Sequence, residues 1–257
     1  MAATTLWAVL LFRGGHGFEG APFLVLIAVG CALLSVEWAA MASPAHSTRV
    51  AIVTTLAVVG VILIAYLRWY EEAWGCVVLG ALFAAAVARS AGARPMDAAY
   101  GVLYIAPAGL LMVWLIETNQ GAGWTLMLFA TTWAADIAAF LVGNLLKGPK
   151  LWPRFSPNKT WSGFIGGLAA AVVAAVAIAA WFMKFSLAGA ALIGLAGGLA
   201  TMAGDLWESI LKRRFGVKDS GDLIPGHGGL LDRVDGLMFA VVVFAVARSI
   251  VRFGWAH

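Results

Sequence analysis

The sequence predicts an all-α, polytopic integral membrane protein with about eight or nine transmembrane helices. Of its 257 residues, 62% are apolar and 12% are charged, whereas soluble domains average roughly 45–50% and about 25%. Long apolar runs alternate with short polar ones. A soluble fold of this size cannot enclose so much apolar surface, because its own exterior must be solvated. The composition therefore argues against a soluble enzyme, a disordered chain and a nucleic-acid-binding domain.

Eight apolar runs are the expected membrane spans, and most reach the roughly 20 residues that cross a bilayer as a helix. They are 21–42, 50–67, 73–92, 98–116, 123–146, 163–183, 185–204 and 236–253. The stretch 2–12 is a candidate ninth span. It has neither a basic segment before it nor a clear small-residue cleavage site after it, so we interpret it as a short first helix rather than a signal peptide.

The positive charges predict the orientation of these spans. Twelve of the 17 Lys and Arg residues fall in or near one set of turns, and five fall in the other. Because Lys and Arg accumulate on the cytoplasmic side, we expect the richer set to face the cytoplasm of a bacterial inner membrane. Two spans separate the richest turns, 147–162 and 205–235, so both turns lie on the same face. An active site built from them faces the cytoplasm.

The sequence divides into an apolar scaffold and a region that carries the candidate catalytic residues. Residues 1–135 are nearly all apolar, and we expect them to form N-terminal transmembrane scaffold helices. From Asp136 onward polar residues are dense and mixed, which marks 136–257 as a catalytic transmembrane region. Cys31 and Cys76 both lie in apolar runs, which argues against a disulfide framework and against a thiolate metal site.

The segment 205–235 concentrates charge of both signs. Asp205, Glu208 and Lys212 recur at helical spacing, so a helix that continues out of the membrane carries all three on one face. Asp205 also ends an otherwise uncharged span, where a carboxylate is costly and usually functional. The alternative reading is a solvated loop with ordinary ion pairs.

A glycine-rich turn, Pro-Gly-His-Gly-Gly at 225–229, lies in the same segment. Its glycines allow positive φ angles and a close approach of the backbone to a ligand, with N–H groups that can cradle phosphate. His227 within it has an alternative role as a ring held by the loop. Asp232 and Asp235 follow. Carboxylates without His or Cys partners suit a hard cation such as Mg²⁺.

The second loop holds Ser-Pro-Asn-Lys-Thr-Trp at 156–161. Ser156 or Asn158 is expected to cap the helix that begins near residue 160. A helix N-terminus beside Lys159 and hydroxyl groups is also a natural phosphate site, and the two roles are compatible. Asp136 lies in the middle of a span, so it needs a partner, either a cation or a basic side chain from these loops.

These residues resemble a known family. The runs Ser-Ile-Leu-Lys-Arg at 209–213, Lys-Asp-Ser-Gly at 218–221 and Pro-Gly-His-Gly-Gly-Leu-Leu-Asp-Arg-Val-Asp at 225–235 resemble the signature of the CDP-diacylglycerol synthases, or phosphatidate cytidylyltransferases. Residues 156–161 resemble the family's second motif, and Asp136, Ala139, Phe140 and Gly143 resemble a third. Two positions depart from the pattern. Phe140 stands where the family often has Tyr, and Ser162 stands where an acidic residue is expected.

The resemblance implies that CTP and phosphatidic acid react to give CDP-diacylglycerol and pyrophosphate, with Mg²⁺ and, as an open alternative, a second cation. It implies Asp205 and Asp232 as metal ligands. The catalytic residues it implies are Lys212, Asp219, His227 and Asp235. The substrate-binding residues it implies are Ser156, Lys159, Thr160, Arg213, Lys218, Gly228, Gly229, Arg233 and Asp136. The expected partners are CTP, phosphatidic acid and membrane lipids, a homodimer is left open, and no nucleic acid is expected.

Two other functions remain open at this stage. A CTP-dependent lipid or polyprenol kinase transfers the γ-phosphoryl group to a hydroxyl, so it leaves CDP and needs a base near that hydroxyl. A transporter, in contrast, places charges deep in the membrane along a path. In this sequence most charges lie in two loops and only Asp136 lies deep, which favours an enzyme.

Overall fold

The computed structural model describes residues 21–118, 120–153, 156–183, 185–221 and 228–254, and the candidate short helix 2–12 lies outside them. Within this part of the chain, eight helices are long and apolar enough to cross a membrane. The prediction of an all-α polytopic membrane protein is therefore confirmed. The chain forms two compact units, which are described in turn. The first holds Met1–Glu117 and Arg214–Arg233, and the second holds Thr118–Arg213 and Val234–His257.

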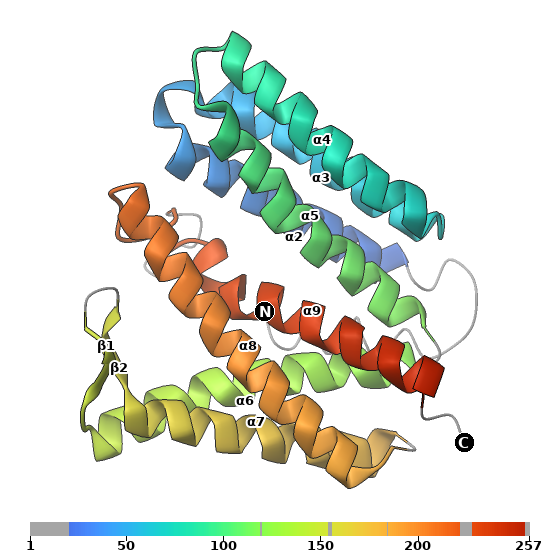
Figure 1. Ribbon diagram of the computed structural model, residues 1–257, viewed down its shortest axis with the longest axis vertical. Coiled ribbons are helices and arrows are strands. Elements are labelled where there is room, and N and C mark those ends of the chain that lie inside the picture. The colour runs from blue at the N-terminus through green and yellow to red at the C-terminus, as the bar shows by residue number, and fades with distance from the viewer. Residues whose placement is uncertain (1–20, 119, 154–155, 184, 222–227, 255–257) are drawn as a thin grey trace. The chain divides into compact units, whose positions relative to one another are not determined.

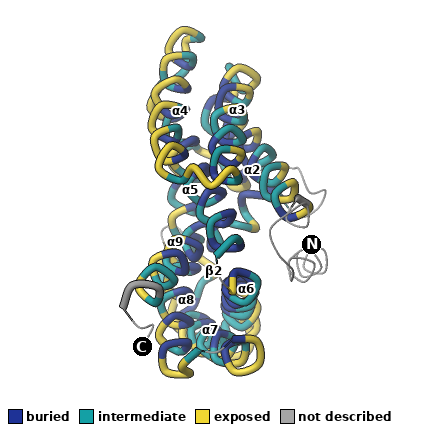
Figure 2. Tube along the Cα trace, turned by 90° about the vertical axis from the view of Figure 1, so that its right-hand side faces the viewer, coloured by how far each residue is buried: buried dark blue, intermediate teal, exposed yellow. Residues whose placement is uncertain are grey.

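Four long helices make up most of the first unit, and each follows one of the predicted apolar runs to within a few residues (Figure 1). They are α2 (Ala21–Ala42), α3 (Ser47–Tyr66), α4 (Tyr70–Ser90) and α5 (Pro95–Glu117), with a short 3₁₀ helix, η2 (Pro44–His46), after α2. The helix α5 contacts α2, α3 and α4, and 56% of its most apolar stretch is buried, against 28% for α4. Figure 2 shows this difference along the two helices. The centre of the bundle is thus α5.

An aromatic cluster ties the segment after residue 213 to this bundle. Trp38 of α2 is fully buried and packs at a tilted angle against Tyr100 and Tyr104 of α5. Its indole N–H donates to the carbonyl oxygen of Asp97 at 2.8 Å. The ring of Phe215 meets Trp38 edge-on at 5.6 Å between ring centroids. Buried aromatic rings of this size dominate packing energetics. The start of the 214–233 segment is therefore fixed to the same core as α2 and α5.

The second unit contains four further long helices and a small β-hairpin (Figure 1). Its elements are α6 (Gly121–Leu146), β1 (Lys150–Trp152), β2 (Ser156–Thr160), α7 (Trp161–Phe182), α8 (Leu187–Arg214) and α9 (Leu231–Gly254). Glycines let α7 lie directly against α6, since a Cβ on Gly163 would stand 2.6 Å from the carbonyl oxygen of Ala139. Such close backbone contact is how membrane helices pack without a hydrophobic driving force between them.

The hairpin corrects the prediction for the 147–162 loop. The strands β1 and β2 pair antiparallel, with Lys150 opposite Thr160, and β2 runs straight into α7. The helix cap is Thr160, whose hydroxyl oxygen accepts from the N–H of Gly163 at 3.2 Å, rather than Ser156 or Asn158. The reason is that Ser156 and Asn158 belong to the strand, several residues before the helix begins.

Ser162, the residue that stands in place of an expected acid, closes the base of the hairpin. Its hydroxyl donates to the carbonyl oxygen of Lys147, and it lies 3.1 Å from the Thr160 hydroxyl. Because the single proton of Ser162 goes to Lys147, Thr160 is the donor of this second bond. A neutral hydroxyl at position 162 therefore orders the chain from Lys147 to the helix start.

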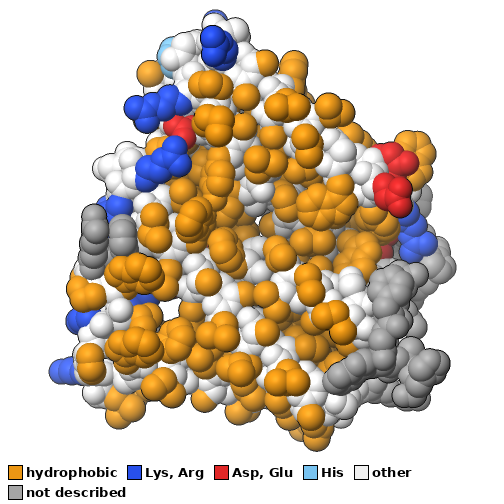
Figure 3. All heavy atoms as spheres, in the orientation of Figure 1, with side chains coloured by type: hydrophobic (Ala, Val, Ile, Leu, Met, Phe, Trp, Pro, Cys, Tyr) orange, Lys and Arg blue, Asp and Glu red, His pale blue; other side chains and the backbone are white. Residues whose placement is uncertain are grey.

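The segment 205–235 is helical at both ends. The helix α8 continues to Arg214, and α9 begins at Leu231, so most charges of the expected loop project from helices. On the outer faces of both units large apolar side chains are exposed, among them Leu56 and Leu79 in the first unit and Val173 and Leu192 in the second. Figure 3 shows such side chains spread over each unit. Apolar surface of this extent faces lipid, and the protein is an integral membrane protein.

Candidate active site

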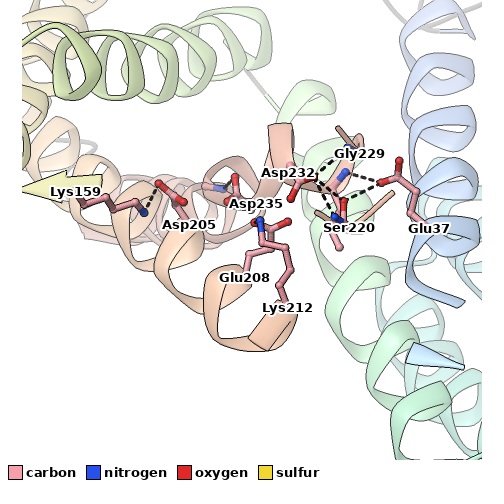
Figure 4. Close-up of polar contacts among 11 residues, drawn as sticks. Glu37, Lys159, Asp205, Glu208, Lys212, Ser220, Gly229, Asp232 and Asp235 are labelled. Carbon is pink, nitrogen blue, oxygen red and sulfur yellow. Dashed lines mark hydrogen bonds and ion pairs between the residues drawn. The ribbon is translucent and has the colours of Figure 1, made fainter. Parts of the chain in front are cut away.

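Lysine–carboxylate pairs cluster around α8 in the second unit. Lys159, near the end of β2, forms an ion pair with Asp205 of α8, in which the two side chains are 26% and 39% exposed (Figure 4). One turn further along α8, Lys212 lies 2.8 Å from Glu208, whose side chain is only 2% exposed. The first pair therefore joins the hairpin to α8, and the second lies in the interior.

Two further carboxylates lie around these pairs. Asp136 of α6 is exposed rather than buried, and it interacts electrostatically with Lys159 and with Asp205. Lys159 is therefore one candidate for the basic partner that Asp136 was expected to need, and a bound cation remains the alternative. Asp235 of α9 is 8% exposed and interacts with Asp205 and Glu208.

The close approach of α8 and α9 brings Asp235 into this group. A Cβ on Gly204 would stand 2.4 Å from the carbonyl oxygen of Asp235, so a larger residue at 204 would force the two helices apart. The carboxylate of Asp235 accepts from the N–H of Gly236 at 2.8 Å. Four carboxylates and two lysines therefore gather at the C-terminal half of α8. Such an arrangement can hold cations and exchange them for the charged groups of a substrate.

A different arrangement surrounds Asp232 in the first unit. One oxygen of its carboxylate, Oδ2, accepts three hydrogen bonds, from the backbone N–H of Ser220 at 3.1 Å, the hydroxyl of Ser220 at 3.1 Å and the N–H of Gly229 at 3.0 Å. Figure 4 shows these contacts. All three donors are uncharged, so they fix the position of the carboxylate and leave its negative charge in place.

Backbone conformation and close packing explain why glycine stands at positions 228 and 229. Gly228 has φ of +80°, a backbone conformation that glycine adopts readily. A Cβ on Gly229 would stand 2.0 Å from the hydroxyl oxygen of Ser220 and 2.9 Å from Oε2 of Glu37. Glycine is therefore required at 229 by close packing. His227 lies outside the described residues.

The remaining predicted residues are distributed as follows. Arg213, Lys218, Asp219 and Arg233 are exposed, and Ser156 lies in β2 opposite Trp152. The structure brings Lys159 and Asp136 to Asp205, and Gly229 to Asp232. The two expected metal ligands, Asp205 and Asp232, belong to different units. The roles of all these residues stay predictions.

Glu37 and Glu208 are buried carboxylates next to the predicted site residues, and the sequence did not assign them to the site. Glu37 of α2 is 3% exposed and accepts hydrogen bonds from the backbone N–H groups of Leu230 and Leu231. Glu208 is 1% exposed and pairs with Lys212. For Glu37 the available signal was its position as the single charged residue in the run 21–42. An ionisable residue inside a span is functional by default.

Comparison with known proteins identifies the relatives of this chain. Residues 2–251 match the model of the cytidylyltransferase family. The phosphatidate cytidylyltransferases of Brucella suis and Brucella melitensis are each 39% identical over 258 residues, covering 97% of this chain and 90% of theirs. The phosphatidate cytidylyltransferase of Staphylococcus aureus is 42% identical over 149 residues, which cover 57% of each chain.

Proposed function

We propose that this chain, which belongs to the cytidylyltransferase family, transfers CMP from CTP to phosphatidic acid. The products are CDP-diacylglycerol and pyrophosphate, and the reaction serves phospholipid biosynthesis. The Brucella proteins to which this chain is 39% identical are named phosphatidate cytidylyltransferase. The residues around α8 and α9 are of the types that such a reaction needs.

The observation that carries the proposal is the ion pair between Lys159 and Asp205. Lys159 belongs to the motif at 156–161, and Asp205 lies just before the signature that begins at 209. The 156–161 motif therefore contacts α8 just before the signature begins. A lysine held by a carboxylate can turn to a phosphate oxygen when substrate arrives, because its ammonium group lies on a flexible four-carbon chain.

The chemistry follows from the charges of the two substrates. An oxygen of the lipid phosphate attacks the α-phosphorus of CTP, and the bond from that phosphorus to the bridging oxygen breaks and releases pyrophosphate. A phosphomonoester ionises with a pKa of about 6, so the nucleophile is already charged and needs no strong base. The work of the protein is positioning and electrostatic stabilisation. Lys159, Lys212 and Arg213 supply positive charge for this purpose, with Lys218 and Arg233.

The donor set fits Mg²⁺. Among the described residues, no three His, Cys, Asp or Glu side chains converge to form a metal site by themselves. A cation here therefore needs oxygen atoms from a substrate as well, and Mg²⁺ is commonly bound by one or two carboxylates together with phosphate oxygens. The carboxylates that the sequence proposes as its ligands are Asp205 and Asp232. When bound, Mg²⁺ offsets the negative charge that gathers on the phosphates.

We place the site at the cytoplasmic face of an inner membrane. One substrate is a lipid and the other is dissolved in the cytoplasm, so the reaction needs an interface between the two. The excess of Lys and Arg in the turns 147–162 and 205–235 supports this orientation.

The test is a product analysis on detergent-purified protein supplied with phosphatidate and with CTP radiolabelled at either the α- or the γ-phosphorus. We expect the α-label in a CDP-lipid and the γ-label in pyrophosphate. Transfer of the γ-label to a lipid hydroxyl, with release of CDP, would instead identify a lipid kinase. Absence of any CDP-lipid from wild-type protein would refute the proposal.

A further inference from the structure

We propose that Glu37, in helix α2, is a positioning residue of the reaction. Its buried carboxylate holds the backbone at Leu230 and Leu231 and thereby sets the place of Asp232. This inference rests on the proposed function, since it assigns Glu37 a part in the same reaction. It also assigns a positioning task to the part of the chain that the sequence marks as scaffold.

Burial of Glu37 requires compensation. The side chain is 3% exposed, and it is the single charged residue of the apolar run 21–42. A buried carboxylate is strongly unfavourable unless hydrogen bonds or opposite charges satisfy it. Within the described part of the chain, no Lys, Arg or His forms an ion pair with Glu37. Its compensation therefore comes from uncharged donors.

Those donors are the first N–H groups of helix α9. Oε1 of Glu37 accepts from the N–H of Leu230 at 2.7 Å, and Oε2 accepts from the N–H of Leu231 at 2.8 Å. The first N–H groups of a helix have no partner within the helix, and the helix dipole makes that end favourable for an anion. Glu37 thus caps α9 from another helix, almost two hundred residues away in the chain.

The hold on α9 reaches Asp232 through adjacent atoms. Three consecutive N–H groups are divided between two carboxylates, because Gly229 donates to Asp232 while Leu230 and Leu231 donate to Glu37. Any shift of Leu230 away from Glu37 must therefore move the N–H of Gly229 relative to Asp232.

Ser220 forms a second link between the same two carboxylates. Its hydroxyl oxygen lies 3.1 Å from Oδ2 of Asp232 and 3.4 Å from Oε2 of Glu37. A hydroxyl has one proton, so it donates to one carboxylate at a time, and the shorter distance favours Asp232. No side chain fits at Gly229 between these groups. Glu37, Ser220, Gly229 and Asp232 therefore form one continuous network.

The matched test compares Glu37→Gln with Glu117→Gln in the full-length protein in detergent. Glu117 lies in the same unit, and its carboxylate pairs with Arg68 and Tyr70 instead of the loop. In Glu37→Gln the side-chain NH₂ group would face a backbone N–H, so one of the two bonds is lost. We expect kcat to fall about 10–100-fold, the range for residues that orient a metal ligand, and the Mg²⁺ concentration for half-maximal rate to rise. Glu117→Gln should change neither quantity.

Hydrogen exchange gives a readout that does not depend on turnover. The amides of Leu230 and Leu231 should exchange faster in Glu37→Gln than in wild type and at the wild-type rate in Glu117→Gln. If the wild type makes no CDP-diacylglycerol, the proposed function fails. The exchange difference still decides whether Glu37 holds the backbone at Leu230 and Leu231. Unchanged exchange and an unchanged Mg²⁺ requirement in Glu37→Gln would overturn the inference.

A double-mutant cycle separates positioning from general destabilisation. If Glu37 acts through Ser220, the losses from Glu37→Gln and Ser220→Ala should be clearly less than multiplicative when combined. Fully multiplicative losses would contradict this path.

Should Glu37→Gln fail to fold, Glu37→Asp keeps the charge on a side chain one carbon shorter. It should restore part of the rate and of the amide protection, and a folded Glu37→Asp with wild-type Mg²⁺ dependence and exchange would overturn the inference as well.

Discussion

The carboxylates around α8 and those beside the start of α9 are stabilised by different kinds of partner. In the second unit Asp205 and Glu208 are each paired with a lysine. In the first unit Asp232 and Glu37 receive hydrogen bonds from backbone N–H groups, and Ser220 adds its hydroxyl. The two sets carry the same kind of acid, and the acids of the α8 set form ion pairs with lysines.

This difference separates two tasks. A lysine can exchange its carboxylate partner for a phosphate oxygen, so the pairs around α8 suit the binding and release of charged substrates. Backbone donors cannot leave, so the acids beside α9 keep one position throughout. The hydrogen bonds beside α9 therefore fix the positions of Asp232 and Glu37, while the lysines beside α8 can change partners.

Loss of charge at the two expected metal ligands is the largest predicted effect. Asp205→Asn and Asp232→Asn should each reduce turnover about a thousandfold or more, since loss of a metal contact removes several kcal/mol of transition-state stabilisation. Asp232→Asn retains an oxygen for the donors of Ser220 and Gly229, so the fold should survive. Steady-state kinetics over a range of Mg²⁺ concentrations measures both effects.

Asp222→Asn is the control for these two variants. It makes the same chemical change in the same segment but outside the fixed positions of the signature. Near-wild-type turnover in either the Asp205 or the Asp232 variant, or equal damage from Asp222→Asn, would show that the metal ligands are wrongly assigned.

The second prediction concerns stability and compares the two lysines. Lys212→Met leaves the buried Glu208 without its lysine, and breaking a buried pair in this way destabilises a protein by about 3–5 kcal/mol. Lys159→Met breaks a pair that is far more exposed, which should change stability by about 0–1 kcal/mol. Thermal unfolding in detergent measures the difference, and equal midpoints for the two variants would contradict the contrast in burial.

The third prediction concerns the activity of a Lys159 variant. Lys159→Ala should lower kcat/KM for CTP or phosphatidate about 10–100-fold, because one charge-assisted contact to phosphate is lost while the protein stays folded. Kinetics with each substrate varied in turn will show which one Lys159 binds. Unchanged values for both substrates would reduce the 156–161 motif to a hairpin and helix cap.

The fourth prediction concerns topology, and it expects no change in activity. Trp152→Cys and Asp222→Cys, placed in a chain without Cys31 and Cys76, should both react with a membrane-impermeant thiol reagent from the cytoplasmic side only. The excess of Lys and Arg in these two turns is the reason. Labelling of the two positions from opposite sides would contradict the prediction that both turns face the cytoplasm.

The helices were predictable because hydropathy alone determines where a chain can cross a membrane. The hairpin was not, since Ser156–Thr160 contains a proline and lacks the alternation of apolar and polar residues that indicates a strand. The contacts of Glu37 and Lys159 could not be predicted from the sequence either. Their partners are distant in the sequence, and Leu230 lies 193 positions after Glu37. The resemblance pointed to Gly229, but the physical reason, its contact with Ser220 and Glu37, needed the structure.

The most direct test of the central claim follows the oxygen atoms of phosphatidate. Phosphatidate with heavy oxygen isotope at its free phosphate oxygens is incubated with the purified protein, CTP and Mg²⁺, and both products are analysed by mass spectrometry. If the lipid phosphate attacks the α-phosphorus of CTP, CDP-diacylglycerol keeps every labelled oxygen and pyrophosphate contains none. Labelled oxygen in pyrophosphate, or a CDP-lipid that has lost part of its label, would contradict the account.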